Sequence, residues 1–348
     1  MDFEELLVSE EITILQAMEK LDRSAKKILL VERDRELLGT VTDGDIRRWI
    51  LGKGDLDGSI NEVMNTSPIT LNVSKSHEAY ELMKEKKVEA IPIVDEKKNI
   101  VSISFWNMKD EVKSKEKFNV PVVIMAGGKG TRLYPYTKIL PKPLIPIGDV
   151  PIVERIIDNF KEFGCQKFYM TINHKKNMIM SYFNEIDKDY DLTYIEEEKP
   201  LGTGGSLSLI KERVKETFFV SNCDTLLNAD YVDIFKFHKG QKNKITMVAS
   251  LRETVIPYGV ITLNDEGHME KITEKPIYNH LINTGVYVIE PDLLHLIPEN
   301  MSYNLPDLAK RCIENNEKVG VYPVSQCSWL DMGQLKEMEN MLHQLRVK

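Results

Sequence analysis

From residue 120 onward, short β-branched runs alternate with helical periods. The runs include VVIM, KFYMTI, FFVSN and TGVYVI, and helical stretches such as IVERIIDNFKEF lie between them. Strands that alternate with helices favour a mainly parallel sheet with helices on both faces. We therefore expect an α/β fold with a mixed, mainly parallel, Rossmann-like sheet. The sequence after residue 120 has no hexapeptide repeat, which argues against an appended left-handed β-helix.

The first 112 residues are organised differently, because one pattern occurs in them twice. In each copy an amphipathic helix precedes two β-branched runs joined by a charged turn, and a second helix begins after them. Val41–Thr42 aligns with Ile103–Ser104, an offset of about 62 residues. Units of this size that cannot each close a core are expected to pack on one another. A duplicated α/β scaffold without a ligand is the alternative interpretation.

A charged segment without apolar periodicity, DEVKSKEKFN, separates the two parts of the chain. Such a composition is typical of a linker. We expect repeats at about 5–58 and 59–112, which together form the domain 1–112, then a linker at 113–119 and a larger domain at 120–348.

Composition narrows the classes of function. The 348 residues carry 46 basic and 54 acidic side chains, a net charge of −8. This balance argues against binding to nucleic acid or to an anionic membrane through bulk charge. No run approaches the ~20 apolar residues of a membrane helix, and the acidic N-terminus does not resemble a signal peptide. Four cysteines without a CxxC pair favour reduced thiols and a cytoplasmic location.

The segment GTVTDGDIRR resembles the signature of a CBS domain, so the two repeats together resemble a CBS pair. The resemblance implies that Thr42 and Asp45 face an adenosine nucleotide, with the carboxylate accepting hydrogen bonds from the ribose hydroxyls. The second copy departs from the pattern with Ser104 and Asn107, which disfavours a second nucleotide site. Alternatively, Asp45 caps a helix that begins at Ile46. Paired CBS units also imply a homo-oligomer.

The predicted strand Val122–Met125 leads directly into the glycine-rich segment AGGKGTRL. Three glycines in four positions let backbone N–H groups approach an anion without obstruction by Cβ atoms. Arg132 and Lys142 add positive charge nearby. The spacing matches neither the P-loop nor the dinucleotide fingerprint. A tight turn that binds nothing is the alternative for the loop alone.

AGGKGTRL followed by PKPL resembles the signature of the sugar-1-phosphate nucleotidyltransferases, and the resemblance extends from about Pro121 to the C-terminus. In this family a sugar 1-phosphate oxygen attacks the α-phosphorus of a nucleoside triphosphate and pyrophosphate leaves, so positioning and charge neutralisation carry the catalysis. The residues that the resemblance assigns to nucleotide binding are Ala126, Gly127, Gly128, Gly130, Thr131, Glu197 and Gly202.

Further motifs follow in the family's order. Asp224 ends the run FFVSNCD and Asp331 lies in WLDMG, and the resemblance implies that both carboxylates bind Mg²⁺. Either aspartate alone would be read as a turn or cap residue. The residues that the resemblance assigns to catalysis are Arg132, Lys142, Asp224, Lys275 and Asp331. Those that it assigns to the sugar are Tyr258, Gly259, Glu274 and Asn283.

The base is predicted from Glu197, which stands where related thymidylyl and uridylyl enzymes often carry glutamine. An ionised carboxylate offers only acceptors, which suit the adjacent N1–H and N2–H₂ donors of guanine. We therefore expect GTP as the donor substrate. A solvated acidic run of Glu196, Glu197 and Glu198 is the alternative.

The sugar is predicted from resemblance alone. Enzymes that join a CBS pair to this catalytic domain resemble those of bacterial legionaminic acid pathways, which favours glucosamine 1-phosphate. Mannose and heptose 1-phosphates stay open, as do UTP, dTTP and CTP as donors. An inactive nucleotide-sensing scaffold is a remote alternative, because Arg132, Lys142, Asp224, Lys275 and Asp331 are all intact.

Overall fold

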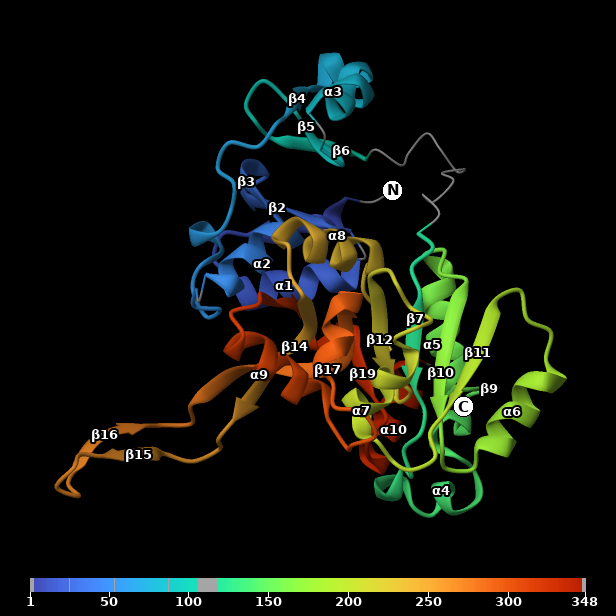
Figure 1. Cartoon of the computed structure of the whole chain (residues 1–348). Helices are drawn as coiled ribbons and strands as arrows, with labels where there is room; N and C mark the ends of the chain where they lie inside the picture. Colours follow the sequence, from blue (N-terminus) through green and yellow to red (C-terminus); the bar gives the residue numbers. More distant parts are fainter. Residues whose placement is uncertain (1–2, 25, 53, 87, 106–117, 346–348) are drawn as a thin grey trace. The chain divides into compact units, whose positions relative to one another are not determined.

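The computed structural model describes residues 3–24, 26–52, 54–86, 88–105 and 118–345 (Figure 1). The chain divides into two compact units, residues 1–114 with 254–279 and residues 115–253 with 280–348. Asn107, residues 113–117 of the predicted linker and the helix expected to follow Phe105 lie outside the described residues. None of the described helices is long and apolar enough to cross a membrane.

The first unit contains the predicted duplication. The first copy comprises β1 (Leu7–Ser9), α1 (Ile14–Ser24), β2 (Ile28–Arg33), β3 (Glu36–Thr42) and α2 (Asp43–Leu51). The second comprises β4 (Leu71–Asn72), α3 (Ala79–Lys86), β5 (Ala90–Val94) and β6 (Ile100–Phe105). In each copy the first strand is parallel to the second and the second is antiparallel to the third.

The two copies agree in detail and share a core. An irregularity in strand register falls at Val31/Glu32 in one copy and at Ile93/Val94 in the other, which is the sequence offset of the repeat. Leu30 and Leu37 of the first copy pack in the same apolar cluster as residues of the second copy. Neither copy therefore closes this core alone, as the sequence predicts.

Residues 254–279 form a hairpin from β15 (Val260–Leu263) and β16 (Met269–Thr273), which pair antiparallel. Ile261 lies opposite Ile272 in the ladder, and both side chains are exposed. Gly259 lies beside Glu274, since a Cβ at Gly259 would be 2.8 Å from Glu274 Oε2.

The second unit is built on a seven-stranded sheet with the order β11-β10-β7-β12-β17-β14-β18. The strands are β7 (Val122–Met125), β10 (Lys167–Ile172), β11 (Asp191–Glu196), β12 (Phe218–Asn222), β14 (Ile245–Val255), β17 (Ile277–Ile289) and β18 (Val319–Val324). β11, β10, β7 and β12 are mutually parallel, β14 is parallel to β18, and β17 is antiparallel to β12. The prediction of a mixed, mainly parallel sheet is confirmed.

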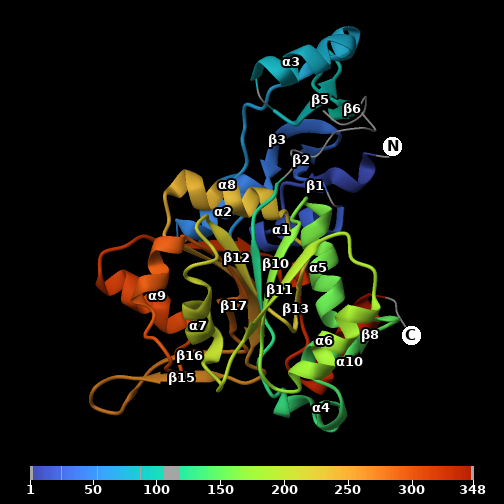
Figure 2. The ribbon, with the colours of Figure 1, turned by 45° about the vertical axis from the view of Figure 1, so that its right-hand side comes forward.

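Helices cover both faces of this sheet, which is why alternate residues of β7 enter different cores. Val122 and Ile124 pack in one core and Val123 and Met125 in another. The helices of the first core are α5 (Ile152–Glu162), α6 (Lys176–Glu185), α8 (Tyr231–Gln241) and α10 (Leu335–Gln344), and that of the second is α9 (Leu305–Glu314). Figure 2 shows α5 and α9 on opposite sides of the sheet. A strand buried on both faces reads as a continuous apolar run, as VVIM does.

The start of the sheet domain is anchored by Phe118. The sequence places this residue in the linker, but its ring packs edge-on against Phe219 and Phe235, with centroids 6.1 and 5.1 Å away. The chain is therefore fixed to the second unit before β7 begins.

Candidate active site

The carboxyl ends of four parallel strands meet at one edge of the sheet. Met125 of β7 pairs in register with Thr171 of β10 and with Asn222 of β12, and Ile172 of β10 pairs with Glu196 of β11. The segments that follow these strands therefore leave the sheet side by side. Ligands of open α/β sheets bind outside such an edge. The glycine-rich loop, Glu197 and Asp224 all follow directly from it.

The glycine-rich loop turns sharply out of β7. Ala126 is still tied to the sheet, because its N–H donates to Thr171 O at 3.0 Å. Gly130 has φ 65°, a left-handed conformation that glycine adopts without strain. Gly128 has no atom within 4 Å of the place where a Cβ would stand, and Thr131 and Arg132 are exposed. The loop therefore offers an open backbone surface beside a basic side chain.

Lys142 and Asp224 form an ion pair within this edge. Lys142 begins a short 3₁₀ turn, Lys142–Leu144, after the loop, and its Nζ donates to Asp224 Oδ2. Both side chains are largely buried, 13% and 11% exposed. An ion pair so far from solvent depends on both partners, because removal of one leaves a buried charge uncompensated.

Asp331 is brought to the same place by a small ladder outside the main sheet. β13 (Thr225–Leu227) pairs antiparallel with β19 (Trp329–Asp331), and Asp331 lies opposite Thr225. The N–H of Met332 donates to Asp224 O at 2.8 Å. The two aspartates that the sequence singles out separately are therefore neighbours.

Burial and neighbouring charges shift the pKa values of Asp331 and Lys142. Burial raises the pKa of Asp331, and the negative charge of Asp224 raises it further. Burial works against the charged form of Lys142, but attraction to Asp224, with smaller contributions from Cys223 and Asp331, holds the Lys142 pKa above its ordinary value. Two carboxylates thus face one ammonium group. When both are ionised, one negative charge is left over, which favours a further cation.

This donor set fits Mg²⁺. The two carboxylates offer the hard oxygen ligands that Mg²⁺ prefers, so Asp224 and Asp331 would hold the ion, and further oxygen ligands from outside the pair would complete its coordination. Lys142 already places one positive charge against Asp224. No group of three or more His, Cys, Asp or Glu side chains with metal-binding geometry occurs among the described residues, so the ion would depend on substrate for the rest of its shell.

Glu197 lies directly after β11 and is buried, with 6% of its surface exposed. Its Oε2 accepts the N–H of Leu201 at 3.2 Å and its Oε1 accepts from Ser206 Oγ at 2.9 Å. A Cβ at Gly127 would stand 2.7 Å from Oε1, so any larger residue there would force the carboxylate to shift. The carboxylate therefore lies against the glycine-rich loop, and it is not part of a solvated acidic run.

Gly202 begins the one-turn helix α7 (Gly202–Gly205) and has φ 74°. A Cβ at this position would meet Tyr303 O at 2.6 Å. Ser206, which follows α7, has no chemical motif around it. For this reason the sequence did not predict that it would contact Glu197.

The predicted sugar-binding residues fall in different units. Asn283 lies near the aspartates, because Thr225 Oγ1 donates to O of the adjoining Thr284 at 3.1 Å. The Asn283 amide donates to Tyr287 Oη at 2.5 Å. Tyr258, Gly259, Glu274 and Lys275 belong to the unit that contains the hairpin, so their approach to Asp224 stays a prediction.

In the first unit, Thr42 and Asp45 contact each other. The Asp45 N–H donates to Thr42 Oγ1 at 3.3 Å, and Asp45 Oδ2 accepts from Thr42 N at 2.9 Å and from Thr42 Oγ1 at 2.6 Å. This capping box makes Thr42 the cap and Asp43 the first residue of α2. The predicted helix start at Ile46 is therefore wrong, because the threonine hydroxyl caps the helix earlier.

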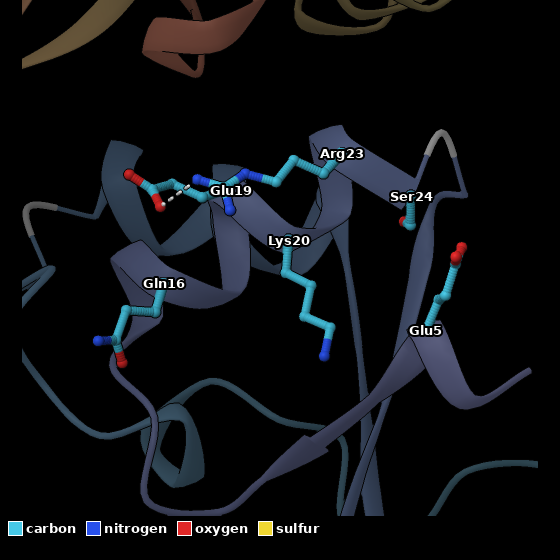
Figure 3. Close-up of a pocket in the computed structure, with 6 residues that line it drawn as sticks. All are labelled: Glu5, Gln16, Glu19, Lys20, Arg23 and Ser24. Carbon is cyan, nitrogen blue, oxygen red and sulfur yellow. Dashed lines mark ion pairs between the residues drawn. The ribbon is translucent and has the colours of Figure 1, made fainter.

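A pocket of about 570 Å³ opens on the same unit beside α1 (Figure 3). Its described lining residues are Glu5, Gln16, Glu19, Lys20, Arg23 and Ser24. Arg23 pairs with Glu19 at 3.5 Å, and Lys20 Nζ donates to Leu7 O at 2.7 Å. Thr42 and Asp45 are not among these described lining residues.

Two known protein families match different parts of this chain. Residues 121–346 match the family described as nucleotidyl transferase. The chain belongs to the nucleotidyl transferase family. Residues 2–52 and 60–103 match the CBS domain family, which confirms the predicted pair of CBS domains.

Curated relatives carry more than one substrate name. The chain is 30% identical over 228 residues to a mannose-1-phosphate guanyltransferase of Pichia angusta, a match over 62% of this chain and 61% of that one. It is 29% identical over 236 residues to a UTP–glucose-1-phosphate uridylyltransferase of Synechocystis sp., over 62% of this chain and 60% of that one. The match thus spans less than two thirds of either relative.

A solved structure shares the fold. HddC from Yersinia pseudotuberculosis aligns with 65% of this chain and 99% of its own, with a TM-score of 0.52 and 22% identity. At this identity the likeness supports the architecture of the sheet domain and nothing finer.

A double-mutant cycle tests the buried ion pair. Lys142→Met should lower the free energy of unfolding by about 3 kcal/mol, because it leaves Asp224 and Asp331 without their counter-charge. Adding Asp224→Asn should recover part of this loss, with a coupling energy of about 2 kcal/mol in urea unfolding.

The control pair is Lys161 and Asp189, whose carboxylate is 73% exposed. Its cycle of Lys161→Met and Asp189→Asn should give a coupling below about 1 kcal/mol. Equal coupling energies for the two pairs would contradict a special role for the buried one.

Proposed function

We propose that this chain transfers a nucleoside monophosphate from a nucleoside triphosphate to a sugar 1-phosphate and releases pyrophosphate. The proposal rests chiefly on one observation: the open glycine-rich loop, Lys142 and the pair Asp224 and Asp331 converge on one edge of the sheet. Membership of the nucleotidyl transferase family supports it. Two partly buried carboxylates that share one counter-charge are energetically costly. This cost argues against an inactive scaffold.

The proposed reaction is an in-line displacement. An oxygen of the sugar phosphate forms a bond to the α-phosphorus, the bond from that phosphorus to the bridging oxygen breaks, and pyrophosphate carries away the electron pair. The glycine-rich loop and Arg132 hold the triphosphate, Lys142 neutralises charge on the reacting phosphates, and Lys275 neutralises the sugar phosphate. Catalysis then comes from positioning and fixed positive charge.

Asp224 and Asp331 would hold Mg²⁺ in this scheme. The ion would supply charge neutralisation to the triphosphate oxygens. Lys142 would stay beside Asp224 and orient its carboxylate.

We propose GTP as the preferred donor because of Glu197. A carboxylate has about four acceptor positions, and Leu201 and Ser206 use two of them. The other two could accept N1–H and N2–H₂ of guanine. Similarity to curated guanyltransferases supports this choice, although a uridylyltransferase is similar to the same degree.

For the sugar we propose glucosamine 1-phosphate, as in the legionaminic acid enzymes that the CBS fusion resembles. Mannose 1-phosphate is the second candidate, because the name of the Pichia angusta relative contains it. A heptose 1-phosphate is the third.

The base preference and its cause can be tested together. Pyrophosphate release with Mg²⁺ should be fastest with GTP when GTP, UTP, dTTP and CTP are crossed with glucosamine, N-acetylglucosamine and mannose 1-phosphates. Glu197→Gln should lower the ratio of kcat/KM for GTP over UTP at least about tenfold, because an amide donor then faces a guanine donor.

The matched control is Glu198→Gln, which changes an exposed neighbour and should leave the ratio unaltered. Faster turnover of UTP or dTTP by the unaltered chain would overturn the choice of GTP.

Asp331→Asn should lower kcat about a hundredfold, and near-normal kcat would remove Asp331 from the site.

We also propose that the CBS pair binds an adenosine nucleotide through Thr42 and Asp45. The capping box uses Asp45 Oδ2 toward Thr42, while Oδ1 accepts from Arg48, whose side chain is 74% exposed and could move aside. A ribose diol could then replace Arg48 on Oδ1.

The resemblance to paired CBS units further supports a homo-oligomer. Sedimentation would test this, and a monomer would contradict it.

Calorimetry tests the sensor. AMP or ATP should bind the whole chain, and Asp45→Asn should weaken that binding about tenfold through loss of a charged acceptor. Asn can still accept from Thr42, so the helix cap persists. Absence of binding by the unaltered chain would contradict the proposal.

A further inference from the structure

Lys175 makes an unusual set of hydrogen bonds beside the candidate active site. Its Nζ donates to the carbonyl oxygens of Thr137 at 3.1 Å, Lys138 at 2.7 Å and Ile139 at 2.8 Å. An ammonium group has three N–H donors, so these three carbonyls can use all of them. The side chain is therefore fully committed within the protein and is not available as a phosphate ligand.

The three carbonyls end the one-turn helix α4 (Tyr136–Ile139). The last carbonyls of a helix have no partner within it, and a lysine at that end satisfies them and offsets the helix dipole. Four residues are too few for a helix to be stable by itself. The position of α4 thus depends on contacts from outside.

The segment that carries α4 has few other anchors. Ile139 is 74% exposed, and Tyr134 and Tyr136 are also exposed. Leu133 and Thr137 are buried, and Thr137 Oγ1 donates to Gly130 O at 2.8 Å. The inner end is therefore held by apolar packing and this hydroxyl, and Lys175 holds the outer end.

Lys175 itself stands on a rigid base. It follows β10 by three residues, and Asn173 between them donates from Nδ2 to Glu197 O at 2.7 Å. Its backbone has φ 54°, a left-handed turn that precedes α6. The lysine is therefore fixed to the sheet edge, and α4 is fixed to the lysine.

We propose that Lys175 is a positioning residue for the triphosphate-binding loop. The segment it fixes connects the glycine-rich loop and Arg132 to Lys142. Through α4, Lys175 sets the distance between the two cations that hold the phosphates. This inference rests on the proposed function, and it assigns Lys175 no contact with substrate.

The test compares Lys175→Met with Lys176→Met. Both changes remove an ammonium group and keep a similar stem, but Lys176 pairs with Glu196 and not with α4. Lys175→Met should raise KM for the triphosphate roughly tenfold, since misplacement of a binding group by about 1 Å is costly. KM for the sugar 1-phosphate should change less than about twofold, and Lys176→Met should change neither value. Lys175→Arg keeps N–H donors at this position and should recover most of the loss.

Limited trypsin digestion gives a second reading that needs no activity. Cleavage after Lys138 should be faster in Lys175→Met than in the unaltered chain or in Lys176→Met, because α4 is released at its outer end. An unchanged KM for the triphosphate, or equal rises in both KM values, would overturn the proposal. If the unaltered chain turns over no substrate, the proposed function fails. In that case, unchanged cleavage after Lys138 in Lys175→Met would also overturn the proposal that Lys175 holds α4.

Discussion

The ion pair between Lys142 and Asp224, with Asp331 beside it, is the interaction on which the candidate site depends. One ammonium group faces two carboxylates. Lys142 and Asp224 are largely buried, and burial together with the charge of Asp224 raises the pKa of Asp331. Buried charges are costly unless they are paired, so the fold must hold these three side chains in place. The remaining negative charge suits the site to a divalent cation, and under the proposed function that cation would in turn neutralise the triphosphate.

The sheet provides this arrangement through its register. Because four parallel strands end at the same level, the glycine-rich loop, Glu197 and Asp224 leave the edge together. The β13–β19 ladder then adds Asp331 from a distant part of the sequence. Rigid strands set the backbone, while the candidate catalytic groups lie on the short segments after them. This division is common in α/β proteins that bind nucleotides.

The sequence predicts what local pattern determines. VVIM predicts a strand because it is apolar throughout. The duplicated unit is visible in the sequence because its pattern recurs at a fixed offset. Contacts between segments far apart in the sequence leave no such local pattern. The helix α2 begins at Asp43 because the Thr42 hydroxyl caps it. Phe118, which belongs to the predicted linker, packs against aromatic rings of the second unit. The hydrogen bonds of Ser206 and Lys175 join segments that no periodicity connects.

We propose that Asp224 and Asp331 form a cation site that acts together with the bound nucleotide. The most direct measurement is the thermal unfolding midpoint with GTP, in Mg²⁺ and in EDTA, for the unaltered chain and for Asp331→Asn. A ligand that binds the folded state raises the midpoint. We expect Mg²⁺ to add to the stabilisation by GTP in the unaltered chain and to add nothing in Asp331→Asn. An equal Mg²⁺ increment in both proteins would contradict it.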